Sequence, residues 1–449
     1  MLNLKSRTLK FSVSGLRGLY PEDINPSNIP ALAVSLHKSI KKGPIAIARD
    51  NRPTGFAISK LIEGVLLAAG REVYDLGVVP TPTIKSFINE KNLPGGIMIS
   101  ASHNPIEYNG FKFIGKDGFF FNEQENARLK SNLETLKLSD WGNKKTALQK
   151  SEYAESHAME NHINSAIKAV WGKAPSLKNL KVAIDPVGGC ACGIIPALLN
   201  RLGVKFVSIH ANVSSIFPRN PEPLPFALKD LGRLVVEEKC DIGFAYDPDA
   251  DRLALVGPDG KPLGEELTLP LVLLKALPQK KGDIVVNLSS SWLNDFAASR
   301  FNRKTIRSAV GEANVVKKML QKKAGFGGEG NGGVIDPAVS SFGRDSVSGT
   351  AYILSLLSEN KNIYESINGF PKLKMKKTVI QTSNLNSLYD KLKKSLPDFK
   401  EDTTDGLRLS HKSGLPWVHL RPSNTEPVVR LIAEASTEAD LKKIFTIFK

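Results

Sequence analysis

The sequence is short of cysteine and has no long hydrophobic run. Its 449 residues include three cysteines, an odd number that offers no disulfide framework and suits a reducing compartment. Cys190 and Cys192 form a Cys-x-Cys pattern without nearby histidines, so we interpret them as small packing residues rather than metal ligands. No stretch approaches the ~18 apolar residues of a membrane span, and the first residues carry no apolar signal core. These absences predict a cytoplasmic protein with no membrane partner.

Positive charge, in contrast, is abundant. Lysine and arginine number 61 against 45 acidic residues, which gives a net charge of +16. A surplus of this size fits either a nucleic-acid surface or a generally basic protein with an anionic small substrate. The lysines are dispersed along the chain and are not interleaved with aromatic residues, as a platform for single strands would be. We therefore expect no nucleic-acid partner, and a basic RNA-binding protein is the non-enzymatic alternative.

The length predicts three or four domains at roughly 100–200 residues per domain. An apolar strand followed by a turn and a helix recurs three times, which indicates α/β layers. The expected strands are 44–48, 181–185 and 283–287, and the expected helices are 54–69, 193–202 and 292–300. The last part has a different pattern, typical of a smaller α+β domain, with helices at 385–396 and 437–448 and strands at 406–409, 417–420 and 428–433. Thr437 is the expected N-cap of the closing helix. The predicted domains are 1–150, 151–256, 257–369 and 370–449.

Three aspartates alternate within residues 247–252, between two apolar runs that we expect to be buried strands. Carboxylates this close repel one another, and hard oxygen ligands in a short loop suit Mg²⁺ or Ca²⁺ rather than zinc or copper. An EF-hand is excluded, because its loop needs Gly at the sixth position and Glu at the twelfth, where this chain has Arg252 and Pro258. Pro248 stiffens the loop, which favours a metal site over the alternative of a solvated acidic turn.

Three other loops carry polar residues. Residues 100–105 follow an apolar strand at 96–99, and the absence of a G-x-S-x-G elbow argues against an acyl-transfer hydrolase. The glycine-rich residues 327–333 interrupt the chain where a helix should begin, which favours close backbone approach to a hydroxyl-rich ligand over a dinucleotide site. Residues 421–427, with Arg430, collect the guanidinium, hydroxyl and amide groups that bind a phosphate dianion, although an ordinary surface turn is the alternative.

Taken in order, these loops resemble those of the α-D-phosphohexomutases, the family of phosphoglucomutase, phosphomannomutase and phosphoglucosamine mutase. The resemblance spans the whole chain and rests on residues 14–18, 49–53, 100–112, 247–252, 328–333 and 421–427. It implies three similar α/β domains with mixed sheets and a smaller α+β C-terminal domain around a central cleft. We expect a monomer or a homodimer.

The resemblance also implies catalytic and metal-binding residues. Ser102 would carry the phosphoryl group, and its oxygen would join three carboxylates in binding one Mg²⁺. Those carboxylates are Asp247, Asp249 and Asp251. Arg17 and Lys112 would contact the transferring group and assist proton movement, and Arg252 would support the metal loop. His103, beside Ser102, would belong to the catalytic set.

The substrate-binding residues are implied in the same way. Glu329 and Asn331 would hold sugar hydroxyls. The phosphate that is not reacting would be bound by Arg421, Ser423, Asn424, Thr425 and Arg430. A hexose 1,6-bisphosphate would serve as activator.

The implied reaction moves a phosphoryl group between the 1- and 6-positions of a hexose phosphate, through a phosphoserine enzyme and a 1,6-bisphosphate; such an enzyme is an isomerase. Pro248 stands where most of the family has Gly, and Gly333 stands where many bacterial members have His. Residues 311–314 also differ from the better-studied specificity loop. We predict a phosphoglucosamine mutase, with phosphoglucomutase or phosphomannomutase as the alternative. A synthase that releases the bisphosphate is a related possibility.

Overall fold

The computed structural model describes residues 6, 8–12, 15–141, 150–214, 216–360, 362–381, 384–422 and 428–448. The chain forms two compact units. The first comprises Met1–Thr268 and Gly332–Ile363, and the second comprises Leu269–Asn331 and Tyr364–Lys449. Among the described helices, none combines the length and the apolar character needed to cross a membrane.

The first unit contains a seven-stranded mixed sheet. Its strands, in spatial order, are β1 (Lys10–Ser12), β2 (Gly15–Leu19), β6 (Tyr108–Gly115), β5 (Gly95–Ile99), β3 (Ile45–Arg49), β4 (Val73–Val78) and β7 (Ser151–Tyr153). The neighbours from β5 to β7 pair in parallel, whereas β5, β6, β2 and β1 pair antiparallel. Strand β5 is buried along its whole length, as expected for a central strand covered on both faces.

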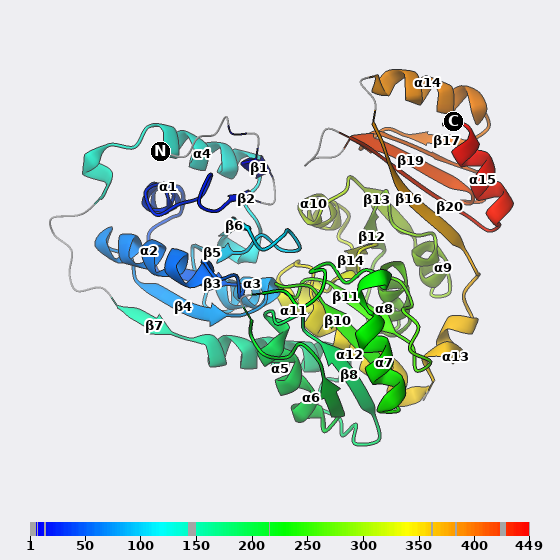
Figure 1. Cartoon of the computed structure of the whole chain (residues 1–449), viewed down its shortest axis with the longest axis horizontal. Helices are drawn as coiled ribbons and strands as arrows, with labels where there is room; N and C mark the ends of the chain where they lie inside the picture. Colours follow the sequence, from blue (N-terminus) through cyan, green and yellow to red (C-terminus); the bar gives the residue numbers. More distant parts are fainter. Residues whose placement is uncertain are drawn as a thin grey trace. The chain divides into compact units, whose positions relative to one another are not determined.

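Helices cover this sheet. Helix α1 (Ile29–Ser39) packs against α2 (Gly55–Ala68) and α4 (Glu123–Glu134), while α3 (Thr81–Glu90) packs against α5 (Glu155–Trp171). The apolar side chains of α1, α2 and α4 join those of the strands in one buried core. Helix α5 follows β7 and leads to the second sheet of the unit (Figure 1).

That second sheet is also mixed. Its strands, in spatial order, are β11 (Leu253–Val256), β10 (Ile242–Tyr246), β8 (Lys181–Asp185) and β9 (Lys205–Ser208). Strands β10 and β11 form an antiparallel hairpin in which Tyr246 pairs with Leu253, so residues 247–252 are the loop of that hairpin. The other pairs are parallel, and α6 (Ala191–Leu202) and α7 (Lys229–Glu237) connect them.

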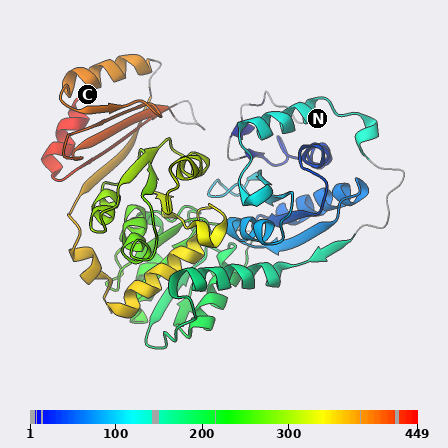
Figure 2. The same ribbon diagram turned by 180° about the vertical axis from the view of Figure 1, so that it is seen from behind.

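The first unit is completed by a segment from much later in the chain. It contains β15 (Gly333–Ile335), α11 (Pro337–Ser340) and α12 (Ser346–Glu359). Helix α12 is buried along most of its length and lies beside α5 (Figure 2).

The second unit contains two sheets of different kinds. In one, β12 (Ile284–Asn287) pairs in parallel with β13 (Thr305–Ser308) and β14 (Phe326–Glu329). The other is antiparallel, in the order β16 (Lys374–Ile380), β20 (Val429–Ala435), β19 (Trp417–Pro422), β18 (Leu407–Ser410) and β17 (Lys400–Asp402). The helices are α8 (Thr268–Ala276), α9 (Leu293–Ser299), α10 (Glu312–Lys322), α13 (Ile363–Asn368), α14 (Leu385–Ser395) and α15 (Glu438–Thr446).

The predicted fold class, α/β domains with mixed sheets and a smaller C-terminal α+β domain, is confirmed. Strand β8 has the predicted bounds, and the Thr437 hydroxyl caps α15 by accepting a hydrogen bond from the Asp440 amide at 3.1 Å. Helix α6 begins at Ala191, two residues before the predicted Gly193. The earlier start follows from a tight turn that ends at Gly189, whose amide donates to the Pro186 carbonyl at 2.7 Å.

Candidate active site

Three loops of the first unit lie at one edge of the seven-stranded sheet because the strands that lead to them are parallel. Because β3, β4 and β5 are parallel neighbours, their carboxyl ends lie at the same edge of the sheet. These ends lead to residues 50–53, to Thr81 at the start of α3, and to residues 100–105. Strand β6 returns antiparallel beside β5 and places Lys112 opposite Met98. Residues far apart in the sequence therefore meet at one edge.

The three aspartates of the β10–β11 loop are fully buried, and each offers an oxygen within 4.8 Å of the others. The loop is fixed by its own backbone, since Asp247 Oδ1 accepts hydrogen bonds from the amides of Asp251 (3.0 Å) and Arg252 (3.1 Å). Burial, together with Asp251 and Asp249, holds the pKa of Asp247 well above its ordinary value. The loop is therefore a tight turn that concentrates negative charge.

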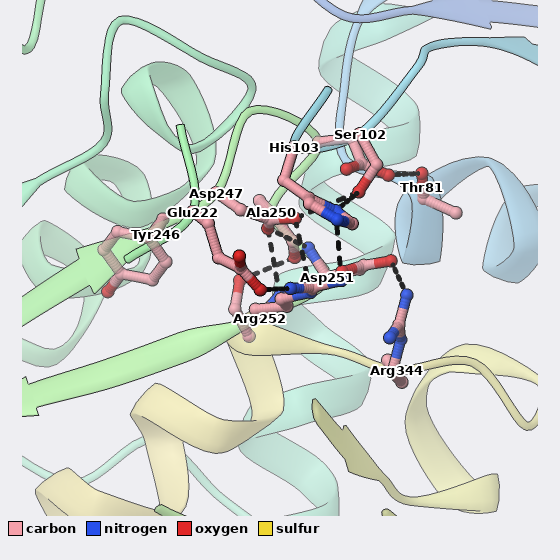
Figure 3. A network of polar contacts seen from close by, with 12 residues as sticks. Thr81, Ser102, His103, Glu222, Tyr246, Asp247, Ala250, Asp251, Arg252 and Arg344 are labelled. Atoms are coloured by element: carbon pink, nitrogen blue, oxygen red, sulfur yellow. Dashed lines mark hydrogen bonds and ion pairs between the residues drawn. The ribbon is translucent and has the colours of Figure 1, made fainter. Parts of the chain in front are cut away.

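Ser102 lies against this loop (Figure 3). Its hydroxyl donates to Asp247 Oδ2 at 3.3 Å, and it lies 3.4 Å from His103 Nδ1. The same His103 nitrogen lies 3.1 Å from a guanidinium nitrogen of Arg252. Arg252 and burial hold the pKa of His103 well below its ordinary value, so the ring is neutral at neutral pH.

The predicted basic residues surround the aspartates. Lys112 Nζ lies 2.5 Å from Asp249 Oδ2 and 3.7 Å from Asp251 Oδ2. Burial by itself lowers the pKa of Lys112, but the two carboxylates outweigh it and raise that pKa above its ordinary value, so the ammonium stays charged. Arg252 Nε lies 3.7 Å from Asp251 Oδ1. Arg17 donates at 2.9 Å to the side-chain oxygen of Asn104, which lies in the loop between β5 and β6 (residues 100–107, here called the serine loop).

Three residues of the cluster were not predicted from the sequence. Arg344 Nη2 lies 2.5 Å from Asp251 Oδ2 (Figure 3). Thr81 donates its hydroxyl to Asp249, and Glu222 accepts from Arg252 Nη1 at 2.5 Å. All three lie in segments that carry no recognisable motif, so no local signal in the sequence could have identified them.

A divalent cation fits the aspartate loop. Asp249 Oδ1 and Asp251 Oδ1 are buried, and neither has a hydrogen-bond donor within the described ranges. Buried carboxylate oxygens without a donor are costly, and the oxygens of three converging carboxylates are the ligands that hard cations prefer. The acidic triad can therefore hold a metal ion.

The charge of the cluster points to an anionic ligand. It contains equal numbers of basic and acidic side chains, namely Arg17, Lys112, Arg252 and Arg344 against Asp247, Asp249, Asp251 and Glu222. A bound divalent cation would keep all three aspartates ionised, and the cluster would then carry two positive charges in excess. A phosphate dianion has the charge that balances this excess.

A close approach of two backbones supports the metal loop. A Cβ atom added to Gly189 would lie 2.5 Å from the Pro248 carbonyl oxygen, and the next amide, of Cys190, donates to that oxygen at 2.8 Å. We expect Gly189→Ala to destabilise the protein by about 1–3 kcal/mol, because backbone atoms cannot move aside as a flexible side chain would. Urea unfolding measures this.

Gly193→Ala, in the helix α6 that follows this turn, is the matched control. The nearest atom to its added Cβ is the Met159 sulfur at 3.4 Å, at the end of a flexible side chain. Alanine should stabilise this helix position by about 0.5–1 kcal/mol. Equal stability of the two variants would show that the approach at Gly189 is not required.

The predicted sugar-binding residues Glu329 and Asn331 lie in the second unit. Glu329, at the end of β14, is buried, and its Oε1 accepts from Asn287 Nδ2 at 2.8 Å and from the Gly311 amide at 2.9 Å. The Gly330 amide donates to Ser290 Oγ at 3.0 Å, and Asn331 follows in the turn. The glycine-rich turn therefore connects two strands and does not open a helix, as the sequence predicted.

The predicted phosphate-binding residues are described in part. Arg421 on β19 is buried and pairs across the sheet with the exposed Arg430 on β20. Within the described residues, Arg421 Nε and Nη1 have no hydrogen-bond acceptor, and the nearest carboxylate oxygen, of Asp405, is 3.7 Å from Nη1. Like charges directly opposite repel, so this pair favours an anion. Ser423, Asn424 and Thr425 lie outside the described residues.

The fold and the site together define a phosphohexomutase. Sequence models of the phosphoglucomutase/phosphomannomutase family match its alpha/beta/alpha domains I, II and III at residues 8–140, 159–260 and 268–373, and its C-terminal domain at residues 385–448. The chain belongs to this family. The predicted resemblance and the predicted enzyme class, an isomerase that transfers a phosphoryl group within its substrate, are confirmed.

Similar proteins span the whole chain. A probable phosphoglucosamine mutase of Methanopyrus kandleri is 30% identical, over 97% of this chain and 95% of its own length. A phosphoglucomutase/phosphomannomutase of Thermococcus kodakarensis is 31% identical, over 95% of each chain. The crystal structure of a phosphoglucomutase/phosphomannomutase family protein from Burkholderia thailandensis has a TM-score of 0.85 and 23% identity, and covers 100% of this chain and 97% of its own.

Proposed function

We propose that this chain is a phosphoglucosamine mutase that interconverts the 6- and 1-phosphates of glucosamine. The observation that carries this proposal is the position of Ser102, whose hydroxyl lies 3.3 Å from Asp247 in a buried loop that fits a divalent cation. The choice of sugar is supported by the relative from Methanopyrus kandleri, whose name is probable phosphoglucosamine mutase. Glucose and mannose phosphates are the alternatives, in agreement with the name of the Thermococcus kodakarensis relative.

In the proposed reaction, phospho-Ser102 gives its phosphoryl group to the free hydroxyl of a sugar monophosphate. The hydroxyl oxygen bonds to phosphorus, the bond from phosphorus to Ser102 Oγ breaks, and the hydroxyl proton ends on Oγ. The resulting 1,6-bisphosphate turns around, and the other phosphate returns to Ser102 by the reverse step. A hexose 1,6-bisphosphate added from outside would phosphorylate resting enzyme, which makes it the expected activator.

The residues of the first unit divide this work. Asp247, Asp249 and Asp251 would hold Mg²⁺ together with Ser102, and the ion would neutralise charge on the transferring group. Lys112, which Asp249 keeps charged, would offset charge on the same group, and phosphoryl transfer needs little beyond such positioning and neutralisation. Arg17, beside the serine loop, is suited to contact the phosphoryl oxygens.

Arg252 and its neighbours would hold the serine loop next to the loop of the three aspartates (residues 247–252). Arg252 connects Glu222 to His103, and His103 lies beside Ser102 (Figure 3). Arg344 would hold Asp251 in place through its ion pair. Because the His103 ring is neutral, the charge near Ser102 comes from the arginines, the lysine and the carboxylates.

In the second unit, Glu329 and Asn331 would bind sugar hydroxyls, and Arg421 and Arg430 would bind the phosphate that is not reacting. Ser423, Asn424 and Thr425 would complete the phosphate site. A phosphate dianion suits the Arg421–Arg430 pair because each guanidinium offers several donors in a planar fork.

A coupled assay with glucosamine, glucose and mannose 6-phosphates tests the proposal, with and without Mg²⁺ and a hexose 1,6-bisphosphate. We expect turnover of all three to need both additions, and the highest kcat/KM for glucosamine 6-phosphate. A higher value for glucose or mannose would assign the chain to the alternative substrate. Free bisphosphate as the main product would indicate a synthase, and no turnover of any sugar would refute the mutase.

Arg421→Ala should raise the KM for the phosphosugar on the order of 10²-fold, because a charged clamp loses about 2–5 kcal/mol when one partner is removed. The rate at which a bisphosphate phosphorylates Ser102, measured by intact-protein mass spectrometry at saturating ligand, should change much less. Lys412→Ala, at an exposed position of the same domain, is the control and should leave both values unchanged. Equal losses in both measurements would show that Arg421 is not a distal clamp.

A further inference from the structure

Arg52 lies in residues 49–53, one of the segments on which the family resemblance rests. It is not among the catalytic, metal-binding or substrate-binding residues described above. Its side chain is buried, and all five of its N–H donors are used within residues 50–108. Nε donates to Asp50 at 3.2 Å. The other four donate to backbone carbonyls, three in the serine loop, of Ser102 (2.8 Å), Asn104 (2.7 Å) and Pro105 (2.5 Å), and one at the start of β6, of Tyr108 (2.8 Å).

The Ser102 amide is linked through Ser100 to the ion pair that Arg52 forms with Asp50. Its N–H donates to Ser100 Oγ at 2.8 Å, and the Ser100 hydroxyl in turn hydrogen-bonds the Asp50 carboxylate. That carboxylate also accepts from the Arg52 amide at 3.1 Å. A closed ring of contacts therefore runs from the Ser102 amide through Ser100, Asp50 and Arg52 back to the Ser102 carbonyl. Both backbone polar groups of Ser102 are fixed by this ring.

This ring matters because Ser102 has a φ of +52°, in the left-handed region that non-glycine residues rarely adopt. Such a conformation costs free energy and persists only where the surroundings over-determine it. The conformation directs Ser102 Oγ towards Asp247, at 3.3 Å. A relaxed backbone at Ser102 would therefore change where its hydroxyl lies relative to the acidic loop.

We propose that Arg52, paired with Asp50, is a positioning residue that holds the Ser102 backbone in its left-handed conformation and so aims Ser102 Oγ at the metal loop. The proposal rests on the proposed function for the identity of Ser102 as the phosphorylated residue. Arg52 does not bind substrate in this account, because every one of its donors is used by the protein. The ring of Phe217 also covers its guanidinium, with 5.2 Å between the guanidinium carbon and the ring centre.

Arg52→Lys tests the proposal, because lysine keeps the charge but cannot donate to four carbonyls and a carboxylate at once. We expect kcat to fall on the order of 10²-fold, the loss typical of a misplaced reacting group, while KM stays within about threefold. Ser100→Ala removes the hydroxyl that links the Ser102 amide to Asp50 and leaves the hydrogen bonds of Arg52 in place, so it should lower kcat about tenfold with the fold intact. This second variant keeps the proposal testable if Arg52→Lys does not fold.

Arg71→Lys is the matched control. Arg71 is also buried, in the same domain, and also uses five donors, four of them on the carbonyls of His37, Ile40, Lys41 and Gly43 and one on the His37 ring. Those acceptors lie outside the site, so Arg71→Lys should lower thermal stability and leave kcat unchanged. Equal losses of kcat in the two lysine variants would show that Arg52 acts on stability alone. A raised KM with unchanged kcat in Arg52→Lys would make Arg52 a substrate ligand and overturn the proposal.

A crystal structure of Arg52→Lys separates this inference from the proposed function, because it needs no turnover. We expect φ of Ser102 to leave the left-handed region in the variant and to stay there in the unaltered protein. Retention of a positive φ in the variant would overturn the proposal even if the protein is an active mutase. Loss of the positive φ would support it even if no hexose phosphate is turned over.

Discussion

Replacing Ser102 with alanine is expected to abolish turnover, with a loss in kcat of at least about 10⁴-fold, while the protein remains folded. In the proposed reaction every phosphoryl group passes through Ser102 Oγ, the atom that lies 3.3 Å from Asp247. Alanine removes this atom and keeps Cβ, so the neighbouring contacts of Arg52 and Ser100 with the backbone remain possible. The coupled assay measures the loss, and intact-protein mass spectrometry after incubation with a bisphosphate should show no gain of a phosphoryl group.

Ser35→Ala provides the control for Ser102→Ala. Ser35 is a buried serine of the same domain, and its hydroxyl donates to the Leu129 carbonyl at 2.5 Å. Its replacement should cost about 1 kcal/mol of stability, as for a typical internal hydrogen bond, and leave kcat unchanged. Substantial turnover by Ser102→Ala, or its phosphorylation to the same extent as the unaltered protein, would refute the serine mechanism.

The sequence predicted those parts of the site that depend only on the pattern of residues within a short segment of the chain. Strand β8 has its predicted bounds, and residues 247–252 form the predicted loop between buried strands, because runs of apolar residues define both. The alternating aspartates fall inside a tight hairpin loop, so their convergence follows from the chain between them. Ser102 could be placed at the end of a strand for the same reason.

The contacts that complete the site could not be predicted in this way. Thr81 and Lys112 reach Asp249 from positions more than a hundred residues earlier, and Arg344 reaches Asp251 from a segment that returns to the first unit after the chain has formed part of the second. Each contact depends on how strands and helices assemble. Thr81 and Arg344 have no local pattern of their own, and the resemblance that indicated Lys112 did not indicate its contact with Asp249. The left-handed backbone of Ser102 is equally invisible in the sequence, because serine has no preference for it.

The second large effect is expected from Asp249→Asn in the acidic loop, residues 247–252. This variant should lower kcat by at least about 10³-fold and should remove the dependence of kcat on Mg²⁺. Asp249 Oδ2 holds Lys112 and Thr81, whereas Oδ1 is buried and has no donor within the described residues. The asparagine amide is neutral and has one oxygen, whereas the aspartate carboxylate is charged and has two. Both the cation and the Lys112 ammonium therefore lose a negative partner. The loss of metal-assisted neutralisation accounts for several kcal/mol of the barrier.

Thermal unfolding measures this effect without reference to activity. A ligand that binds only the folded protein stabilises it by about 2.7 kcal/mol at a hundred times its Kd, so Mg²⁺ should raise the Tm of the unaltered protein above its value in EDTA. Asp249→Asn should show no such rise. Asp185→Asn is the matched control, because Asp185 is a buried carboxylate at the end of the adjacent strand β8 that is satisfied by Arg219 (2.6 Å) and His210 (3.1 Å). Its loss should lower the Tm in EDTA and in Mg²⁺ alike, leaving the difference between them intact. If Asp249→Asn retained the full difference, the cation would not be bound by the acidic loop, and the charge balance inferred for the phosphate would no longer hold.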